Sequence, residues 1–160
     1  FHARYAARSK TYRYRILSGG VSSPFERRYA WHIPQVLDCP AMRDTTVLLR
    51  GRHDFAAFQA SGSSVATTER TIFRCELDGL SADASALGDG VRAGASLIAF
   101  EITGDGFLRH MVRTIVGTLV EVGSGRRDPA SVEQAIQSRD PRQVGPTAPA
   151  RGLFLVRVNY

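Results

Sequence analysis

The sequence contains few cysteines and no long apolar segment. Cys39 and Cys75 are its only cysteines, and neither belongs to a CxxC or CxxH pattern. Two isolated thiols suggest neither a disulfide framework nor a zinc site, so we interpret both as reduced packing residues. No signal peptide and no apolar run of membrane-spanning length is present, which predicts a soluble, cytoplasmic protein without membrane contact. Because the sequence begins with Phe1, we expect the true amino terminus to lie elsewhere.

The signatures of several common enzyme classes are also absent. There is no GxxxxGK(S/T), no GxGxxG that opens a helix after a strand, no GxSxG and no HExxH. Nucleoside triphosphate binding, dinucleotide binding, serine hydrolysis and zinc proteolysis therefore lack their usual patterns. The histidines are scattered without ligand spacing, so we predict packing or surface roles and no metal site. Asp54, in the segment RHDF, is interpreted as a turn or cap residue rather than a catalytic acid.

Lysine is nearly absent, whereas arginine is abundant. The formal charge is +6, and of the 21 basic residues all but Lys10 are arginine. Arginine suits phosphate binding and base stacking, although genome composition produces the same bias. Residues 1–15 hold five basic residues and no acidic one, interleaved with Phe1 and three tyrosines. This pattern is typical of an edge that faces nucleic acid; the alternative is a solvated, charged strand edge that guards against aggregation.

Hydrophobic periodicity predicts an α+β fold with an antiparallel sheet and helices packed on one face. With 43% hydrophobic residues, the chain can form one domain over residues 1–160 or one lobe of something larger. Alternation predicts strands at 10–17, 70–77, 97–103 and 153–160, with Phe73 pointing inward. Helices are expected near 38–51, over 104–123 and after Pro129. Residues 29–33 are expected to be short and irregular or extended, 51–64 a partly ordered loop, and 78–94 the longest, variable loop.

The segment GDGFLRHMVRTIVGTLVEVG at 104–123 is predicted to be a buried helix, because its apolar residues spread over half of the helical circumference. Asp105 is expected to cap its first turn. Arg109 and Arg113 lie one turn apart at the border of the apolar arc, and Gly117 is expected to leave open space beside Arg113. A guanidinium at such a border must reach water or meet a carboxylate or phosphate.

Taken in order, five segments of the chain resemble the carboxy-terminal half of the TruA family of tRNA pseudouridine synthases. They are FHARYAARSKTYRYRI at the start, GRHDFAAF at 51–58, the RTI at Arg70, the helical segment just described, and TAPARGLFLVRVNY at the end. The resemblance covers nearly the whole chain. It implies a pseudouridine-synthase-like lobe of an isomerase that modifies uridine in the anticodon stem-loop of tRNA, needs no cofactor and forms homodimers. The catalytic aspartate of that family lies in an Arg-Thr-Asp-Ala-Gly motif, which this sequence lacks, since Arg70-Thr71 runs on to Ile72.

The resemblance also implies roles for individual residues. Tyr12 matches the active-site tyrosine that packs against the target uracil, and Arg113 matches the arginine that pairs with the catalytic aspartate. Further candidates for contacts with the RNA backbone are Arg4, Arg13, Arg15, Arg109 and His110. The missing aspartate implies that the isolated chain is inactive.

Two other interpretations stay open at this point. One is a non-catalytic RNA-binding domain in which Tyr12 and Tyr14 stack bases and arginines hold phosphate. The other is an interaction domain whose exposed strand edges serve dimerisation.

Overall fold

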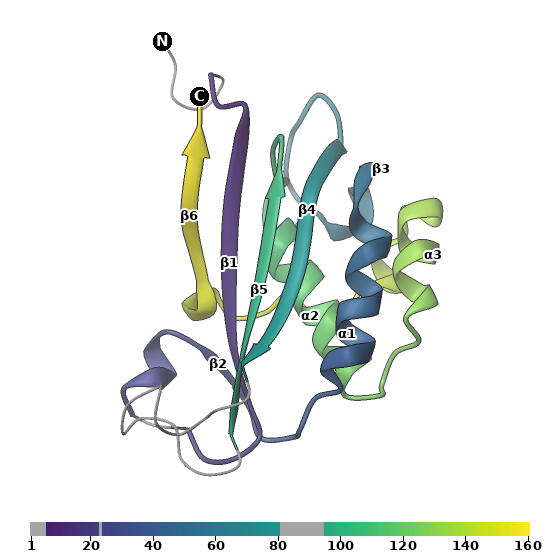
Figure 1. The fold of residues 1–160 in the computed structure, drawn as a ribbon. Helices are drawn as coiled ribbons and strands as arrows, with labels where there is room; N and C mark the ends of the chain where they lie inside the picture. The colour runs from purple at the N-terminus through teal and green to yellow at the C-terminus, as the bar shows by residue number, and fades with distance from the viewer. Residues whose placement is uncertain (1–5, 23, 81–94) are drawn as a thin grey trace.

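The computed structural model describes residues 6–22, 24–80 and 95–160 and contains one mixed sheet with three α-helices. Figure 1 shows the helices together on one side of the sheet, which confirms the expected α+β class. The strands are β1 (Ser9–Ser18), β2 (Trp31–Ile33), β3 (Gly51–Asp54), β4 (Glu69–Leu80), β5 (Ser96–Gly104) and β6 (Leu153–Asn159). The helices are α1 (Cys39–Thr46), α2 (Met111–Gly123) and α3 (Ala130–Ser138). None of the helices in the described ranges is long and apolar enough to cross a membrane.

The sheet has the order β2-β1-β5-β4-β3, and β6 also pairs with β1. The expectation of a purely antiparallel sheet is wrong in one place, because β2 runs parallel to the end of β1 from Ile16 to Ser18. On the same side of β1, the strand β6 runs antiparallel and pairs with the first part of β1, from Ser9 to Tyr14. Alternation in β1 predicts the strand and its two faces but carries no information about the direction of its partners.

The predicted faces of β1 are confirmed. Tyr14 and Ile16 are fully buried in the core, and Arg13 and Arg15 lie on the opposite face. The phenolic hydroxyl of Tyr14 donates a hydrogen bond to the carbonyl of Pro149 at 2.6 Å. Burial raises the pKa of Tyr14 to about 12. The core therefore holds Tyr14 as a neutral, hydrogen-bonded side chain.

The orientation predicted for Phe73 is wrong. Its side chain is 57% exposed, whereas Ile72, Cys75 and Leu77 are buried. The pairing of β4 with β5 shifts register between Ile72 and Arg74, so the local β-bulge adds one residue and reverses the alternation. Cys75 is a free thiol whose pKa burial raises to about 12, and Cys39 is also free.

The long central helix begins later than the periodicity predicts. Its first helical residue is Met111, and the preceding His110 has the left-handed conformation, with φ of +60°. A residue with positive φ cannot continue the right-handed helix, so residues 105–110 form an irregular turn before it. Asp105 does not cap the helix; its carboxylate accepts a hydrogen bond from the backbone N–H of Thr71 at 2.9 Å.

The remaining elements agree in part with the predictions. Asp38 caps α1 by accepting from the N–H of Ala41 at 3.0 Å. The expected loop at 51–64 contains β3 and a 3₁₀ helix, η3 (Ala56–Phe58). Asp54 is a turn residue, since its carboxylate accepts from the N–H of Ala56 at 3.0 Å. Of the predicted variable loop, residues 78–80 belong to β4, and 81–94 lie outside the described residues.

Candidate active site

The candidate site is a cavity of about 300 Å³ at the start of α2, where the helix meets β1 and β6. Tyr12 comes from β1, Arg113 from α2 and Leu153 from β6, so segments far apart in sequence meet here. The other residues that line the cavity are Phe107, Leu108, Arg109, His110, Met111, Val112 and Ala150. The structure therefore places Tyr12, Arg109, His110 and Arg113 around one cavity.

Tyr12 presents an aromatic wall to this cavity. Its ring is partly buried and packs edge to face against Phe107, with centroids 5.3 Å apart and an angle of 89° between the planes. This T-shaped contact is a favourable geometry for two aromatic rings and restrains the tyrosine side chain. A restrained aromatic ring beside open volume is a suitable platform for a planar ligand.

One nitrogen of the Arg113 guanidinium is hydrogen-bonded, and the two terminal nitrogens are available as donors. Its Nε donates to the carbonyl of Ala148 at 2.7 Å, and the N–H of Ala148 donates back to the carbonyl of Arg113 at 3.1 Å. Neither terminal guanidinium nitrogen has a hydrogen-bond or ion-pair partner within the described part of the chain. Two such nitrogens match the two oxygens of a carboxylate or a phosphate.

The expectation of open space beside Gly117 is wrong. A β-carbon at this position would overlap the carbonyl group of Pro146. The segment 145–148 crosses α2 in direct contact with the helix backbone, and the N–H of Gly145 donates to the hydroxyl of Thr118 at 2.9 Å. Gly117 therefore permits the close approach that brings the Ala148 carbonyl to Arg113. An isolated glycine within an apolar helix is a sequence signal of such contact.

Arg109 adds positive charge to the cavity, which it lines together with His110. Both side chains are exposed, and the carbonyl of Arg109 accepts from the N–H of Ala60 at 3.0 Å, which fixes the backbone there. Partial desolvation, followed by the charges of Arg113 and Arg109, lowers the pKa of His110. Among the described residues that line the cavity, none is acidic. Two arginines without a local carboxylate favour binding of an anionic ligand.

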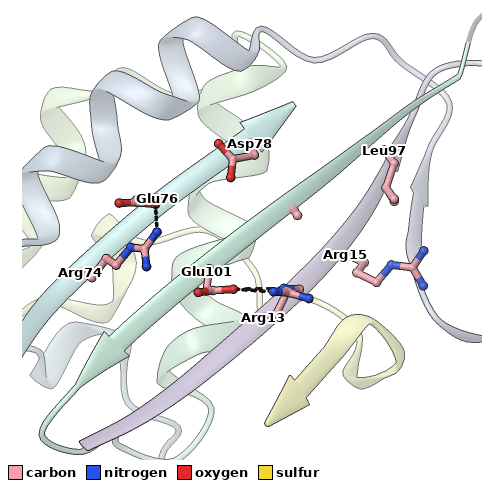
Figure 2. Close-up of a pocket in the computed structure, with 8 residues that line it drawn as sticks. Arg13, Arg15, Arg74, Glu76, Asp78, Leu97 and Glu101 are labelled. Atoms are coloured by element: carbon pink, nitrogen blue, oxygen red, sulfur yellow. Dashed lines mark hydrogen bonds and ion pairs between the residues drawn. The ribbon is translucent and has the colours of Figure 1, made fainter. Parts of the chain in front are cut away.

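Arg13 and Arg15 lie on the other face of the sheet, in a cavity that Arg74, Glu76 and Glu101 also line (Figure 2). Arg13 pairs with Glu101 at 2.8 Å and Arg15 with Glu26 at 3.0 Å. An RNA contact by either arginine would thus be separate from the cavity at Tyr12. Arg4 lies outside the described residues.

Burial of Tyr14 removes one part of the open RNA-binding interpretation. Because this side chain is fully buried and donates to Pro149, it has no free face on which a base could stack. Of the two tyrosines in that interpretation, Tyr12 alone borders a cavity. Within the described ranges, no group of three or more His, Cys, Asp or Glu side chains could hold a metal ion.

Sequence reasoning missed three contributors to the site. Phe107 lies in the segment predicted to be helical, but it contacts Tyr12 from the turn that precedes α2. The backbone carbonyl of Ala148 has no side-chain signature, and Leu153 was assigned only to a strand. Their roles depend on tertiary contacts between distant segments.

A restrained tyrosine and an arginine with unpaired nitrogens, sharing one basic cavity, define a site for a planar, anionic ligand such as a nucleotide. Comparison with known proteins identifies the family of the chain. The profile of a family described as tRNA pseudouridine synthase matches residues 46–160. The chain belongs to the tRNA pseudouridine synthase family.

Individual relatives carry the same description. The chain is 46% identical over 160 residues to tRNA pseudouridine synthase A of Syntrophotalea carbinolica, covering all of this chain and 58% of that protein. The corresponding protein of Moorella thermoacetica is 43% identical, with 59% of it covered, and that of Geobacillus kaustophilus is 40% identical, with 57% covered. The chain thus spans about three fifths of the length of these relatives.

Proposed function

We propose that the full-length protein isomerises uridine to pseudouridine in tRNA and that this chain supplies the base-stacking and charge-pairing half of the active site. The observation that carries the proposal is the shared cavity of Tyr12 and Arg113. The target uridine would be flipped out of the RNA and its uracil would pack against Tyr12, because stacking on an aromatic ring compensates for lost base stacking.

Arg113 would pair with the catalytic aspartate, supplied by a part of the protein outside this chain. Its two unpaired guanidinium nitrogens can hold both carboxylate oxygens, while the Ala148 carbonyl holds Nε. A nearby guanidinium lowers the pKa of a carboxyl group and keeps it ionised, as a nucleophile must be.

The reaction would proceed by nucleophilic attack of that aspartate on the uridine. The carboxylate bonds to C1′ as the glycosidic bond between N1 and C1′ breaks, the uracil rotates, and the carboxylate leaves C1′ as a bond forms between C5 and C1′. The proton from C5 leaves and N1 gains one, so that the product is an isomer of the substrate. The isomerisation requires no change of oxidation state and no co-substrate.

Three finer points rest on the family resemblance. We propose that the uridines lie in the anticodon stem-loop, that the full-length protein is a homodimer, and that it acts in the cytoplasm. Leu155 and Val156, on the edge strand β6, are 55% and 46% exposed and offer apolar surface for contact with another part of the protein.

A nucleoside analysis of treated tRNA tests the proposed function. We expect the full-length protein to convert uridine to pseudouridine, and the 160-residue chain to convert none because it lacks the nucleophile. Pseudouridine produced by the isolated chain would mean that a residue of this chain performs the attack. No pseudouridine from the full-length protein would contradict the assignment of function.

The two tyrosines of β1 are expected to respond differently to substitution. In the full-length protein, Tyr12→Ala should weaken tRNA binding about tenfold because a stacking surface is lost, whereas Tyr12→Phe should retain binding. Tyr14→Phe should leave binding unchanged and lower the free energy of unfolding by about 1 kcal/mol, because the hydrogen bond to Pro149 is lost.

The ionisation of Tyr14 provides a check on this comparison. Its pKa is raised in the folded state, so the unfolded chain loses this proton first and stability should fall between pH 10 and about 12. Tyr14→Phe should remove that part of the decline, as measured by urea unfolding across the pH range. Equal effects of Tyr12→Ala and Tyr14→Phe on tRNA binding would contradict the separate roles.

A further inference from the structure

A second cavity, of about 490 Å³, adjoins the candidate active site. Arg109 and His110 line both cavities, so this dipeptide forms the wall between them. On the far side, the second cavity is bordered by the end of η3 and by the segment 145–147 that crosses α2. Its chemistry is that of a polar site, because amide, hydroxyl, imidazole and guanidinium groups line it.

Gln59 is the first sign that this cavity takes a ligand. The side chain lines the cavity, and its Nε2 is buried without a hydrogen-bond partner. Buried donors are nearly always paired in folded proteins, since an unpaired one destabilises the fold. The side chain is therefore a polar group at the cavity wall whose hydrogen bonds are incomplete.

Two threonine hydroxyls add further polar groups at the cavity wall. Oγ1 of Thr114 and Oγ1 of Thr147 lie 3.3 Å apart and hydrogen-bond to each other. One hydroxyl donates to the other, and because Thr147 is exposed, the pair can still donate to and accept from a ligand or water. Since Thr114 is buried in α2, the pair is fixed at the cavity wall.

The cavity is therefore polar and carries positive charge. Arg109 adds a guanidinium with no side-chain partner in the described part of the chain, and no described lining residue is acidic. Hydrogen-bond donors combined with positive charge match the phosphate, ribose and base oxygens of a nucleotide.

The walls are also held in place before any ligand binds. The N–H of Ala60 donates to the carbonyl of Arg109 at 3.0 Å, which ties the η3 segment to the dividing dipeptide. The N–H of Gly145 donates to Thr118 at 2.9 Å, which ties the opposite wall to α2. A preformed cavity of this kind binds a ligand at a small cost in ordering.

We propose that the second cavity binds the nucleotide next to the target uridine in the same RNA strand. This inference rests on the proposed function, because the target must occupy the cavity at Tyr12. The neighbouring nucleotide is covalently attached to the target and must lie close by, and the two cavities share one wall. Arg109, on that wall, contacts the phosphate between the two nucleotides, while Gln59 and the threonine pair provide polar contacts to the neighbour.

The experiment uses the full-length protein and a tRNA stem-loop in which one uridine is converted. Two further RNAs lack the base on the 5′ or the 3′ neighbour of that uridine. For the unsubstituted protein, we expect kcat/KM to fall about tenfold for one of these RNAs, which identifies the bound neighbour. Equal kcat/KM for all three RNAs would overturn the proposal.

Gln59→Leu provides the matched test of the cavity. It should lower kcat/KM about tenfold on the intact RNA, and the abasic substitution should then cost little more, because both changes remove the same interaction. Gln134→Leu, at an exposed position of α3, is the control and should change neither value. Independent, multiplying losses from Gln59→Leu and the abasic substitution would contradict the contact.

A second variant and a binding measurement complete the experiment. Thr147→Val, at an exposed position, should show the same loss of sensitivity to the abasic neighbour and serves if Gln59→Leu does not fold. Equilibrium binding of the three RNAs is measured in parallel. If the intact RNA yields no pseudouridine, the proposed function fails. The second cavity is still supported in that case if the unsubstituted protein binds one abasic RNA more weakly than the intact RNA and the variant does not. Equal binding of all three RNAs by the unsubstituted protein and by the variant overturns the second cavity.

Discussion

Pseudouridine formation by the full-length protein is expected to fall by about three orders of magnitude when Arg113 is replaced by alanine. Removing one partner of a buried, hydrogen-bonded ion pair costs about 3–5 kcal/mol. The loss would appear in the transition state, because the nucleophilic carboxylate would lose both its orientation and the charge that keeps it ionised. Single-turnover kinetics with saturating protein measure this step apart from tRNA binding.

The pH dependence of the residual activity of Arg113→Ala is a second test of the pairing between Arg113 and the catalytic aspartate. Without the guanidinium, the pKa of the catalytic aspartate should rise, so the acidic limb of the rate profile should move to higher pH. Arg113→Lys should recover little, because a lysine ammonium has no planar fork and cannot donate from Nε to Ala148. Arg126→Ala, at an exposed arginine beyond the end of α2, is the control and should leave kcat unchanged. An unshifted acidic limb in Arg113→Ala would show that this arginine does not face the nucleophile.

Substitution of Gly117 by alanine should damage stability and activity together. The added methyl group would overlap the carbonyl of Pro146, and neither backbone segment can yield without losing hydrogen bonds. Overpacking of this kind costs about 1–3 kcal/mol of unfolding free energy. If the segment 145–148 moves away instead, the carbonyl of Ala148 no longer holds Nε of Arg113, and kcat should fall about tenfold or more.

Urea unfolding and kcat, measured on the same preparation, test both effects. Gly79→Ala is the matched control, because its new β-carbon would meet the sulfur of Cys39 at 3.4 Å, an ordinary contact. We expect that control to lie within about 0.5 kcal/mol of the unsubstituted protein. Unchanged stability and kcat in Gly117→Ala would mean that the crossing segment does not position Arg113.

Local pattern predicted the elements whose residues alternate or repeat at a regular interval. The faces of β1 and the cap of α1 agree with the structure because each depends on neighbours within a few residues. Three features escaped this reasoning. The bulge in β4 depends on its partner strand, the parallel pairing of β2 depends on the edge that β6 leaves open, and the start of α2 depends on the left-handed turn at His110.

The order of its motifs was enough to assign the chain to its family, and it predicts roles for Tyr12 and Arg113, because those motifs lie in contiguous stretches of sequence. The arrangement of the site came from packing. Gly117 leaves room for the segment that crosses α2, and the carbonyl of Ala148 accepts a hydrogen bond from Nε of Arg113. Arg109 lines two neighbouring cavities. Such contacts join residues that are distant along the chain, and their geometry is set by close packing and backbone hydrogen bonds, which residue spacing does not encode.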